Sequence, residues 1–408
     1  MLSSHPPSPH ALHAEDFLAL ERDDWLVAEI ERAAGTSNRS PRSWRRTFAR
    51  FDAARSRPFT LIYETLDGPQ ELVTVTLSRG VPDQTPACPT GTSSKVGFQR
   101  FPNDPSLPGL GKVLAASKDV RVLRYRPGRR CTLRAALAGR PAIAKVFPDS
   151  DGARIHRDGF ELARAASELL FRVAQPLDWD RTSCTLWQEL LPGSPVFETL
   201  RSSSGVARDM GAALASLACA PLRPDARFLA VDQMSRSARY GRALARQVPG
   251  AVARVEELLM QLQTRHDNAR SRPGVPIHGS PHVHQWLRDG DALALVDFDR
   301  LALGEPELDV ATFLAEMDFE DPNEIRVAEI NESFLEGYRS VWPELDPIRI
   351  QTYRAHKHLS KALRAARSIR RDGDRRALRY LRSALALARG DQVSPELAIE
   401  VGGGQVAE

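Results

Sequence analysis

The most informative stretch of this 408-residue chain lies between residues 278 and 299. It begins with His278-Gly279-Ser280-Pro281-His282-Val283-His284-Gln285 and, after an apolar run, ends with Val296-Asp297-Phe298-Asp299. Histidine, amide and carboxylate side chains are the types that transfer protons and bind magnesium. An apolar strand that ends in aspartate is one way in which a fold delivers a carboxylate to a site. This stretch is therefore the predicted functional centre.

The composition is that of a globular protein, with 42% apolar and 26% charged residues. No apolar run reaches the roughly 18 residues of a membrane-spanning helix, so we expect no contact with a membrane. The net charge of +4 is too small to imply nucleic acid by itself. The cysteines show no paired spacing, which argues against a zinc site or a disulfide framework and predicts a cytoplasmic location. They are Cys88, Cys131, Cys184 and Cys219.

Lysine is rare in this chain, and one lysine lies inside an apolar strand. Only six of the 56 basic residues are lysine, and Lys145 falls in the predicted strand Pro141–Phe147. Alternation along the strand puts Ile143, Lys145 and Phe147 on one face. A lysine on a buried face needs anions, which phosphate oxygens and a carboxylate would supply. The alternative is an edge-strand lysine whose ammonium group reaches solvent.

Two further strands are predicted before this one, Val120–Tyr125 and Cys131–Ala136. The turn between them is Pro127-Gly128-Arg129-Arg130. Its arginines are either phosphate contacts or part of a plain hairpin turn.

After the lysine strand we expect a helix, capped by Asp149 or Ser150 and running to Val173. Glu161 and Glu168 share one face of that helix. A later strand, Cys184–Glu189, runs into Leu190-Leu191-Pro192-Gly193. A strand followed by a Pro-Gly stop is the expected form of a hinge between two lobes.

The segment from Val120 to Ala315 resembles the aminoglycoside phosphotransferase and choline kinase-like family, which consists of small-molecule kinases with a protein-kinase-like fold. The resemblance rests on four motifs: Ala142-Ile-Ala-Lys145, Glu189-Leu-Leu-Pro-Gly193, His278 to Gln285, and Val296-Asp297-Phe-Asp299 followed by Gly304-Glu-Pro306-Glu-Leu-Asp309. It implies an α+β fold with a small antiparallel β N-lobe and a larger helical C-lobe. The sequence departs from the family at Ser280, where the family has the aspartate that accepts the hydroxyl proton.

The resemblance implies ATP as a cofactor and assigns residues to it. Lys145 would hold the phosphates, and Glu161, or alternatively Glu168, would orient Lys145. Backbone groups from Glu189 to Leu191 would hold the adenine.

Magnesium is the second cofactor that the resemblance implies. Asp297 would bind it directly, and Gln285 would be its second ligand, because the family has either Asn or Gln there. Asp299 would assist at the metal or hold the loop. By the same comparison His278 packs and forms hydrogen bonds, and Asp309 fixes the loop.

Ser280, at the position of the catalytic base, leaves two hypotheses. A serine hydroxyl does not accept a proton at pH 7, and a general base contributes about 10²–10⁴ in rate. The first hypothesis is a phosphotransferase that acts on a small-molecule or peptidyl hydroxyl, slowly or with His282 or His284 as the base. The second is a pseudokinase that binds nucleotide or a partner protein. A metal site made only of His278, His282 and His284 is a weaker alternative.

The rest of the chain extends this arrangement on both sides. The predicted organisation is a tail (1–14), an N-terminal accessory unit with a linker (15–110), the N-lobe (111–190), the helical C-lobe (191–400) and a mobile tail (401–408). Within the accessory unit, Arg57–Leu77 echoes Arg130–Phe147, with Thr76 at the position of Lys145. This indicates a duplicated hairpin, unless the similarity arose by chance.

The last part of the C-lobe is strongly basic. Residues 348–389 form two predicted helices with thirteen lysine and arginine residues but only two acidic ones, Asp372 and Asp374. They present either an ordinary solvated face or a surface for an acidic partner. No aromatic stacking pattern accompanies them, which disfavours nucleic acid.

Overall fold

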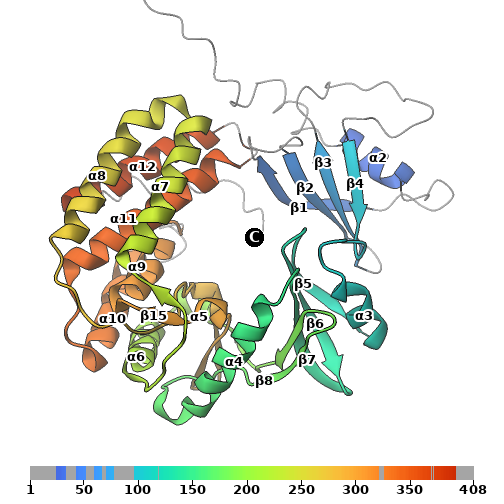
Figure 1. Cartoon of the computed structure of the whole chain (residues 1–408), viewed down its shortest axis with the longest axis horizontal. Helices are drawn as coiled ribbons and strands as arrows, with labels where there is room; N and C mark the ends of the chain where they lie inside the picture. The colour runs from blue at the N-terminus through green and yellow to red at the C-terminus, as the bar shows by residue number, and fades with distance from the viewer. Residues whose placement is uncertain are drawn as a thin grey trace, which may run out of the picture.

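The computed structural model describes residues 24–33, 43–51, 59–66, 70–77, 96–117, 119–320, 326–368, 370 and 372–391. In this part of the chain, two antiparallel sheets come first and a helical lobe follows (Figure 1). The predicted α+β, two-lobed architecture is confirmed. The predicted tails, 1–14 and 401–408, lie outside the described residues.

The N-lobe is a five-stranded antiparallel sheet with the order β5-β6-β7-β9-β8. Its strands are β5 (Arg121–Arg126), β6 (Arg130–Leu137), β7 (Arg140–Val146), β8 (Pro176–Asp180) and β9 (Thr185–Glu189). Alternating small and apolar residues of β6 and β7, such as Leu133 and Ala144, are fully buried. The sequence analysis missed β8, because only the first residue of this edge strand is buried and the strand shows no apolar alternation.

Helix α4 (Asp151–Arg164) packs against this sheet and is shorter than predicted. The expected end at Val173 is wrong, because the chain leaves the helix after Arg164 and becomes extended. The backbone of Arg172 then pairs with β14 (Ala292–Leu295), with its N–H 2.8 Å from Leu293 O and its carbonyl 3.1 Å from Leu295 N. This pairing ties the N-lobe to the C-lobe.

The C-lobe consists of helices and two small sheets. Its helices are α5 (Val196–Leu200), α6 (Gly205–Cys219), α7 (Ala230–Gln247), α8 (Val252–Asp267), α9 (Pro306–Met317), α10 (Val327–Val341), α11 (Pro347–Ala366) and α12 (Gly373–Arg389). One sheet joins β10 (Ser194–Pro195), β13 (Trp286–Asp289) and β14, and the other joins β11 (Arg227–Phe228), β15 (Ala302–Gly304) and β12 (Val275–Ile277). The loop 278–285 connects β12 to β13, and the loop 296–301 connects β14 to β15. The two small sheets therefore hold both halves of the predicted centre.

An accessory four-stranded sheet precedes the N-lobe. Its strands are β1 (Trp44–Phe51), β2 (Phe59–Thr65), β3 (Leu72–Leu77) and β4 (Val96–Arg100), and helix α2 (Asp24–Ala33) shares their apolar core. The side-chain amide of Gln70 forms hydrogen bonds with the N–H (2.9 Å) and the carbonyl (3.2 Å) of Val122, at the end of β5. On its other side, Phe51 N–H donates to Arg367 O (2.8 Å), just after α11. The accessory sheet thus contacts both lobes (Figure 1).

The two segments of the predicted duplication are both antiparallel hairpins. In the first, Thr76 in β3 pairs with Thr60 in β2; in the second, Lys145 in β7 pairs with Thr132 in β6. A duplication requires that both segments form the same kind of hairpin, and they do. The duplication itself stays a prediction.

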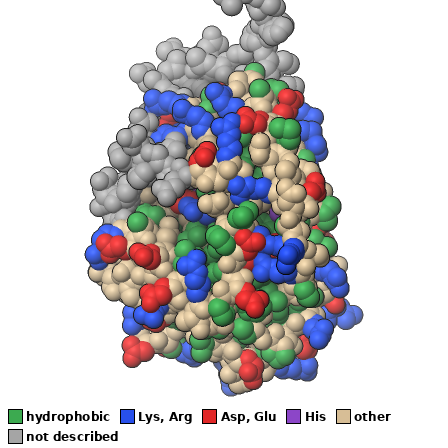
Figure 2. Space-filling view, turned by 90° about the vertical axis from the view of Figure 1, so that its left-hand side faces the viewer, with side chains coloured by type: hydrophobic (Ala, Val, Ile, Leu, Met, Phe, Trp, Pro, Cys, Tyr) green, Lys and Arg blue, Asp and Glu red, His purple; other side chains and the backbone are tan. Residues whose placement is uncertain are grey.

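The basic segment 348–389 forms two helices, as predicted: α11 ends at Ala366 and α12 begins at Gly373. Several of its cations are neutralised by acids of other helices: Arg354 pairs with Asp318 (2.6 Å), and Arg389 pairs with Glu257. The face of the molecule shown in Figure 2 carries basic, acidic and apolar side chains side by side. No helix among the described residues is long and apolar enough to cross a bilayer.

Helices α6 and α10 cross on two glycines, which yields a test of the packing. A Cβ at Gly337 would lie 1.9 Å from Arg208 O. Gly337→Ala is therefore expected to lower the free energy of unfolding by about 1–3 kcal/mol, measured by urea denaturation. Gly111→Ala in α3 (Gly109–Ala116), where a Cβ meets nothing within 4 Å, should instead stabilise the protein by about 0.5–1 kcal/mol. Equal effects of the two substitutions would contradict this account.

Candidate active site

The loop 278–285 is anchored by a buried carboxylate of α9. Asp309 accepts hydrogen bonds from His278 N–H (2.6 Å) and Gly279 N–H (2.8 Å). Burial raises the pKa of Asp309 to about 6, although these two donors oppose the rise. Gly279 has a φ of 80°, and a Cβ there would lie 2.5 Å from Arg300 O, so only glycine fits. The spacing from Gly304 to Asp309 in the sequence thus places a carboxylate under the loop.

A cluster of four charges lies at the junction of the lobes. Lys145 donates to Asp297 Oδ1 (3.0 Å) and to Asp299 Oδ1 (2.6 Å), and its side chain is only 7% exposed. Arg130 forms an ion pair with Asp299 and lies 3.8 Å from Asp297. Burial raises the pKa of Asp297, but the charges of Lys145 and Arg130 outweigh it and hold this pKa well below its usual range. The lysine and the two aspartates that the sequence singles out are therefore in direct contact.

Arg130 owes its position to a carboxylate outside the predicted N-lobe motifs. Asp104 accepts hydrogen bonds from Gly128 N–H (2.7 Å) and from the Tyr125 hydroxyl (2.9 Å). These bonds hold the β5–β6 turn, and Arg130 begins β6 directly after it. Arg130 of this turn reaches the charged cluster, so the turn does more than connect two strands of a hairpin.

Asp297 has a left-handed backbone conformation, with φ 69° and ψ 48°. Such a conformation is uncommon for residues other than glycine and is found preferentially at functional sites. The next residue, Phe298, packs on Phe171 with parallel rings 6.1 Å apart and on the ring of His278 at 4.5 Å. This packing on both sides holds the backbone that presents Asp297.

His278 lies inside the protein and not at its surface. It is completely buried, and its Nε2 lies 3.0 Å from Val296 O, to which it donates. Burial lowers the pKa of His278 to about 4, so the ring is neutral at pH 7. The structure gives His278 a packing position between the two loops.

Neither predicted helix glutamate reaches Lys145. The side chain of Glu161 is 57% exposed and pairs with Arg164 (2.8 Å), and Glu168 lies exposed beyond the end of α4. The predicted Lys145–Glu161 pair is therefore absent.

The acidic residue on the inner face of α4 is Asp158. It is buried and pairs with Arg154 (2.8 Å), which also donates to Asp299 O (2.9 Å). The buried stripe of α4 runs through Ile155, Asp158 and Leu162, and this phase turns position 161 outward. The apolar positions Ile155 and Leu162 mark the buried stripe in the sequence, and this signal would have favoured Asp158 over Glu161.

Gln285 links the two loops through its side-chain amide. Its Nε2 donates to Asp297 Oδ2 (3.2 Å), and its Oε1 accepts from His282 N–H (2.7 Å). Asp297 and Asp299 supply carboxylate oxygens, the ligand type that magnesium prefers, whereas Gln285 would add its amide oxygen only after the amide group rotates. The described residues contain no group of three His, Cys, Asp or Glu side chains that could hold a metal ion, so the histidine-only site is not formed.

Ser280 lies at one end of a chain of polar contacts. Its Oγ is 3.0 Å from His282 Nε2, and His282 Nδ1 is 3.3 Å from Glu316 Oε1. Glu316 also accepts from Lys361 (2.6 Å). Burial raises the pKa of Glu316, but the hydrogen bond to His282 and the charge of Lys361 outweigh it and hold this pKa below its usual range. His284 points elsewhere, against Phe197 and 3.8 Å from Glu320.

The hinge residues border a separate cavity of about 700 Å³. Glu189 and Leu191 line it together with the segment 169–173 and the start of β14. Lys145, Asp297 and Ser280 do not contribute to its wall, so this cavity is not the charged centre.

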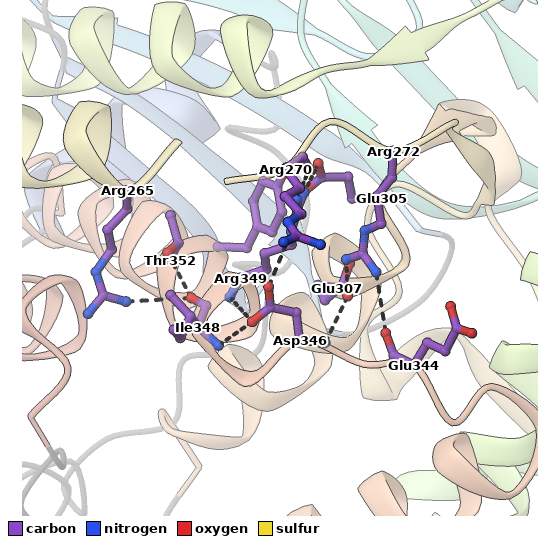
Figure 3. Close-up of polar contacts among 11 residues, drawn as sticks. Arg265, Arg270, Arg272, Glu305, Glu307, Glu344, Asp346, Ile348, Arg349 and Thr352 are labelled. Atoms are coloured by element: carbon purple, nitrogen blue, oxygen red, sulfur yellow. Dashed lines mark hydrogen bonds and ion pairs between the residues drawn. The ribbon is translucent and has the colours of Figure 1, made fainter. Parts of the chain in front are cut away.

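Two glutamates that the sequence analysis left without a role fix the start of α9 (Figure 3). Glu305 pairs with Arg349 of α11, and the fully buried Glu307 pairs with Arg272. Asp346 caps α11 and donates its own N–H to Glu307 Oε1 (3.0 Å). These contacts fix the first turn of α9 relative to α11, and with it the anchor of the loop 278–285.

Removing one partner from this network tests its contribution. Arg349 is 7% exposed and its partner Glu305 is 18% exposed, so Arg349→Ala would leave an uncompensated, largely buried carboxylate. We expect the free energy of unfolding to fall by about 3 kcal/mol. The control is Arg339→Ala on the exposed face of α10, which should change it by about 0.5 kcal/mol or less. A thermal melt of both variants measures the difference, and equal melting temperatures would refute the assignment.

The comparisons with known proteins agree with this fold. The crystal structure of the aminoglycoside phosphotransferase APH(4)-Ia superposes with a TM-score of 0.51 at 14% identity, over 70% of this chain and 99% of that one. Amicoumacin kinase hAmiN, in complex with AMP-PNP, Ca²⁺ and Ami, gives 0.50 at 16% identity, over 65% and 87%. No curated protein sequence matches the chain. The sequence profile of the phosphotransferase enzyme family (APH) matches residues 132–348, and the chain belongs to this family.

Proposed function

We propose that this protein is an ATP- and magnesium-dependent phosphotransferase that transfers phosphate to a hydroxyl group of a small molecule. The observation that carries the proposal is the contact of Lys145 with Asp297 and Asp299 across the two lobes. A buried cation beside oxygen ligands for a metal is what holding a nucleotide phosphate chain requires. The complex of amicoumacin kinase with AMP-PNP and Ca²⁺ supports a nucleotide and a divalent metal in this fold.

The nucleotide would replace contacts that the side chains make with one another. Lys145 and Arg130 now neutralise Asp297 and Asp299 and would turn to the phosphate oxygens. The two carboxylates and the amide oxygen of Gln285 would then hold magnesium, which shields the phosphate charge. The backbone from Glu189 to Leu191 would hold the adenine.

We further propose that His282 is the proton acceptor that replaces the missing aspartate. The acceptor hydroxyl would pass its proton to Ser280 Oγ, whose own proton moves to His282 Nε2 across the 3.0 Å contact. Glu316 accepts from Nδ1–H and stabilises the imidazolium that forms. Phosphoryl transfer depends mainly on positioning and electrostatics, so a base displaced by one side chain is compatible with turnover.

Nucleotide binding is tested by thermal stability. ATP with magnesium at about 100 times its Kd is expected to stabilise the protein by about 2.7 kcal/mol and to raise its Tm. Lys145→Met should abolish the shift, because it removes the buried phosphate ligand. Lys112→Met, which removes an exposed lysine paired with Asp180, should leave it intact. The absence of a shift in the wild-type protein at any ATP and magnesium concentration would rule out the proposed function.

The proton relay is tested by ATP hydrolysis with water as the acceptor. His282→Gln is expected to lower the rate by about 10²-fold or more, because it removes the base. His284→Gln, an exposed histidine of the same loop, is the control and should hydrolyse ATP at the wild-type rate. Equal rates for both variants would refute the relay.

The same assay separates an enzyme from a pseudokinase. Ser280→Asp, which restores the family's carboxylate, should hydrolyse ATP at least as fast as the wild type. If neither the wild type nor this variant hydrolyses ATP although both bind it, the protein acts by binding and not by turnover.

A further inference from the structure

Three cations gather beside the loop that carries Ser280. Arg236 comes from α7, Arg300 from the turn after Asp299, and Lys357 from α11. Helix α11 packs against α7, and the charges of both arginines act on Lys357. The guanidinium carbons of Arg236 and Arg300 lie 5.1 Å and 4.7 Å from the centre of the same ring, that of Phe228. All three residues are partly exposed.

Carboxylates act on Arg300 and Lys357 only through their charge: Asp309 and Asp297 on Arg300, and Glu316 and Asp309 on Lys357. Within the described part of the chain, no carboxylate forms an ion pair or a hydrogen bond with Arg236, Arg300 or Lys357. Nη2 of Arg300 is buried and has no hydrogen-bond partner at all. Buried donors in folded proteins are nearly always paired, so this nitrogen points to a missing acceptor.

The carboxylates nearest to the cluster are engaged elsewhere. Asp309 accepts two backbone N–H groups, Asp297 pairs with Lys145, and Glu316 pairs with Lys361 and His282. The like charges of the three cations are therefore only partly compensated. Burial and the charge of Arg236 lower the pKa of Arg300 to about 10. Burial and the charge of Arg300 lower that of Lys357 to about 7.

The cluster adjoins the position where the acceptor hydroxyl must lie. A Cβ on Gly279 would meet the backbone of Arg300 at 2.5 Å and the ring of Phe228 at 3.2 Å. Arg300 and Phe228 therefore pack directly against Gly279, which precedes Ser280. The cations that face the nucleotide phosphates, Lys145 and Arg130, belong to the N-lobe and are paired with Asp297 and Asp299. The cluster is thus a second basic site, on the C-lobe side of the loop.

We propose that Arg236, Arg300 and Lys357 bind an oxyanion, a phosphate or a carboxylate, that belongs to the acceptor molecule. Guanidinium groups bind these planar or tetrahedral anions through paired, charge-assisted hydrogen bonds. The acceptor is then an anionic hydroxyl compound, held with its hydroxyl toward Ser280. The assignment of the anion to an acceptor rests on the proposed phosphotransferase function, whereas the anion site itself does not.

The experiment is titration calorimetry of the full-length protein with inorganic phosphate, in the presence of saturating ADP and magnesium. A parallel titration with acetate distinguishes a phosphate site from a carboxylate site. Sodium chloride of equal ionic strength is the blank. Binding of either anion is expected, and Arg236→Gln or Arg300→Gln should weaken it about tenfold or more, since each removes a charged donor.

Arg239→Gln is the matched control, because Arg239 is an exposed arginine of the same helix without a partner in the described residues. It should change the affinity by less than about twofold. Arg236→Gln removes one of the two like charges that lie over the ring of Phe228. The Tm of this variant without ligand should therefore not fall, and an unchanged Tm shows that the variant is folded.

The outcomes separate this site from the nucleotide site. The absence of binding by both anions, or phosphate binding that ADP abolishes and that depends on Lys145 but not on Arg236, overturns the proposal. Anion binding that depends on Arg236 in a protein that fails to bind ADP supports the site while it refutes the proposed phosphotransferase.

Discussion

The buried contact of Lys145 with Asp297 and Asp299 joins strand β7 of the N-lobe to a loop of the C-lobe. The partners are more than 150 positions apart in the chain, and they meet where little water reaches them. A buried lysine is unfavourable unless anions compensate its charge, so this contact requires both lobes to be in place. The left-handed backbone of Asp297 and the Asp309 anchor under the neighbouring loop serve this one geometry.

In the proposed relay, His282 and Glu316 would compensate for the serine that stands where the resemblance implies an aspartate. A serine alone would leave the acceptor hydroxyl without a base. Ser280 contacts His282, and His282 contacts Glu316. Lys361 holds Glu316 ionised. A site that had lost its chemistry would have no need of such an ordered chain, which is why we favour a displaced base.

The balance of charge around the site has two parts. On the N-lobe side, the cations Lys145 and Arg130 are matched by carboxylates, as a metal and nucleotide site requires before its ligands arrive. On the C-lobe side, the like charges of Arg236, Arg300 and Lys357 are only partly compensated. Cations that repel one another are stabilised when an anion binds, so the second group indicates a ligand that carries negative charge.

The sequence by itself determined what depends on local pattern. Alternation along the predicted strand placed Lys145 on one face with Ile143 and Phe147. The resemblance implied that Asp309 fixes the loop. Where the pattern was weak the prediction failed, as at the edge strand β8 and at the end of α4.

Tertiary structure alone decided which side chains became partners. The phase of α4 put Asp158 inside and left Glu161 in solvent. His282 connects Ser280 to Glu316 because α9, which carries Glu316, packs beside the loop 278–285. Arg236, Arg300 and Lys357 came together from three separate elements. Periodicity acts over a few residues, whereas these contacts depend on how whole elements pack, and packing is a property of the folded chain.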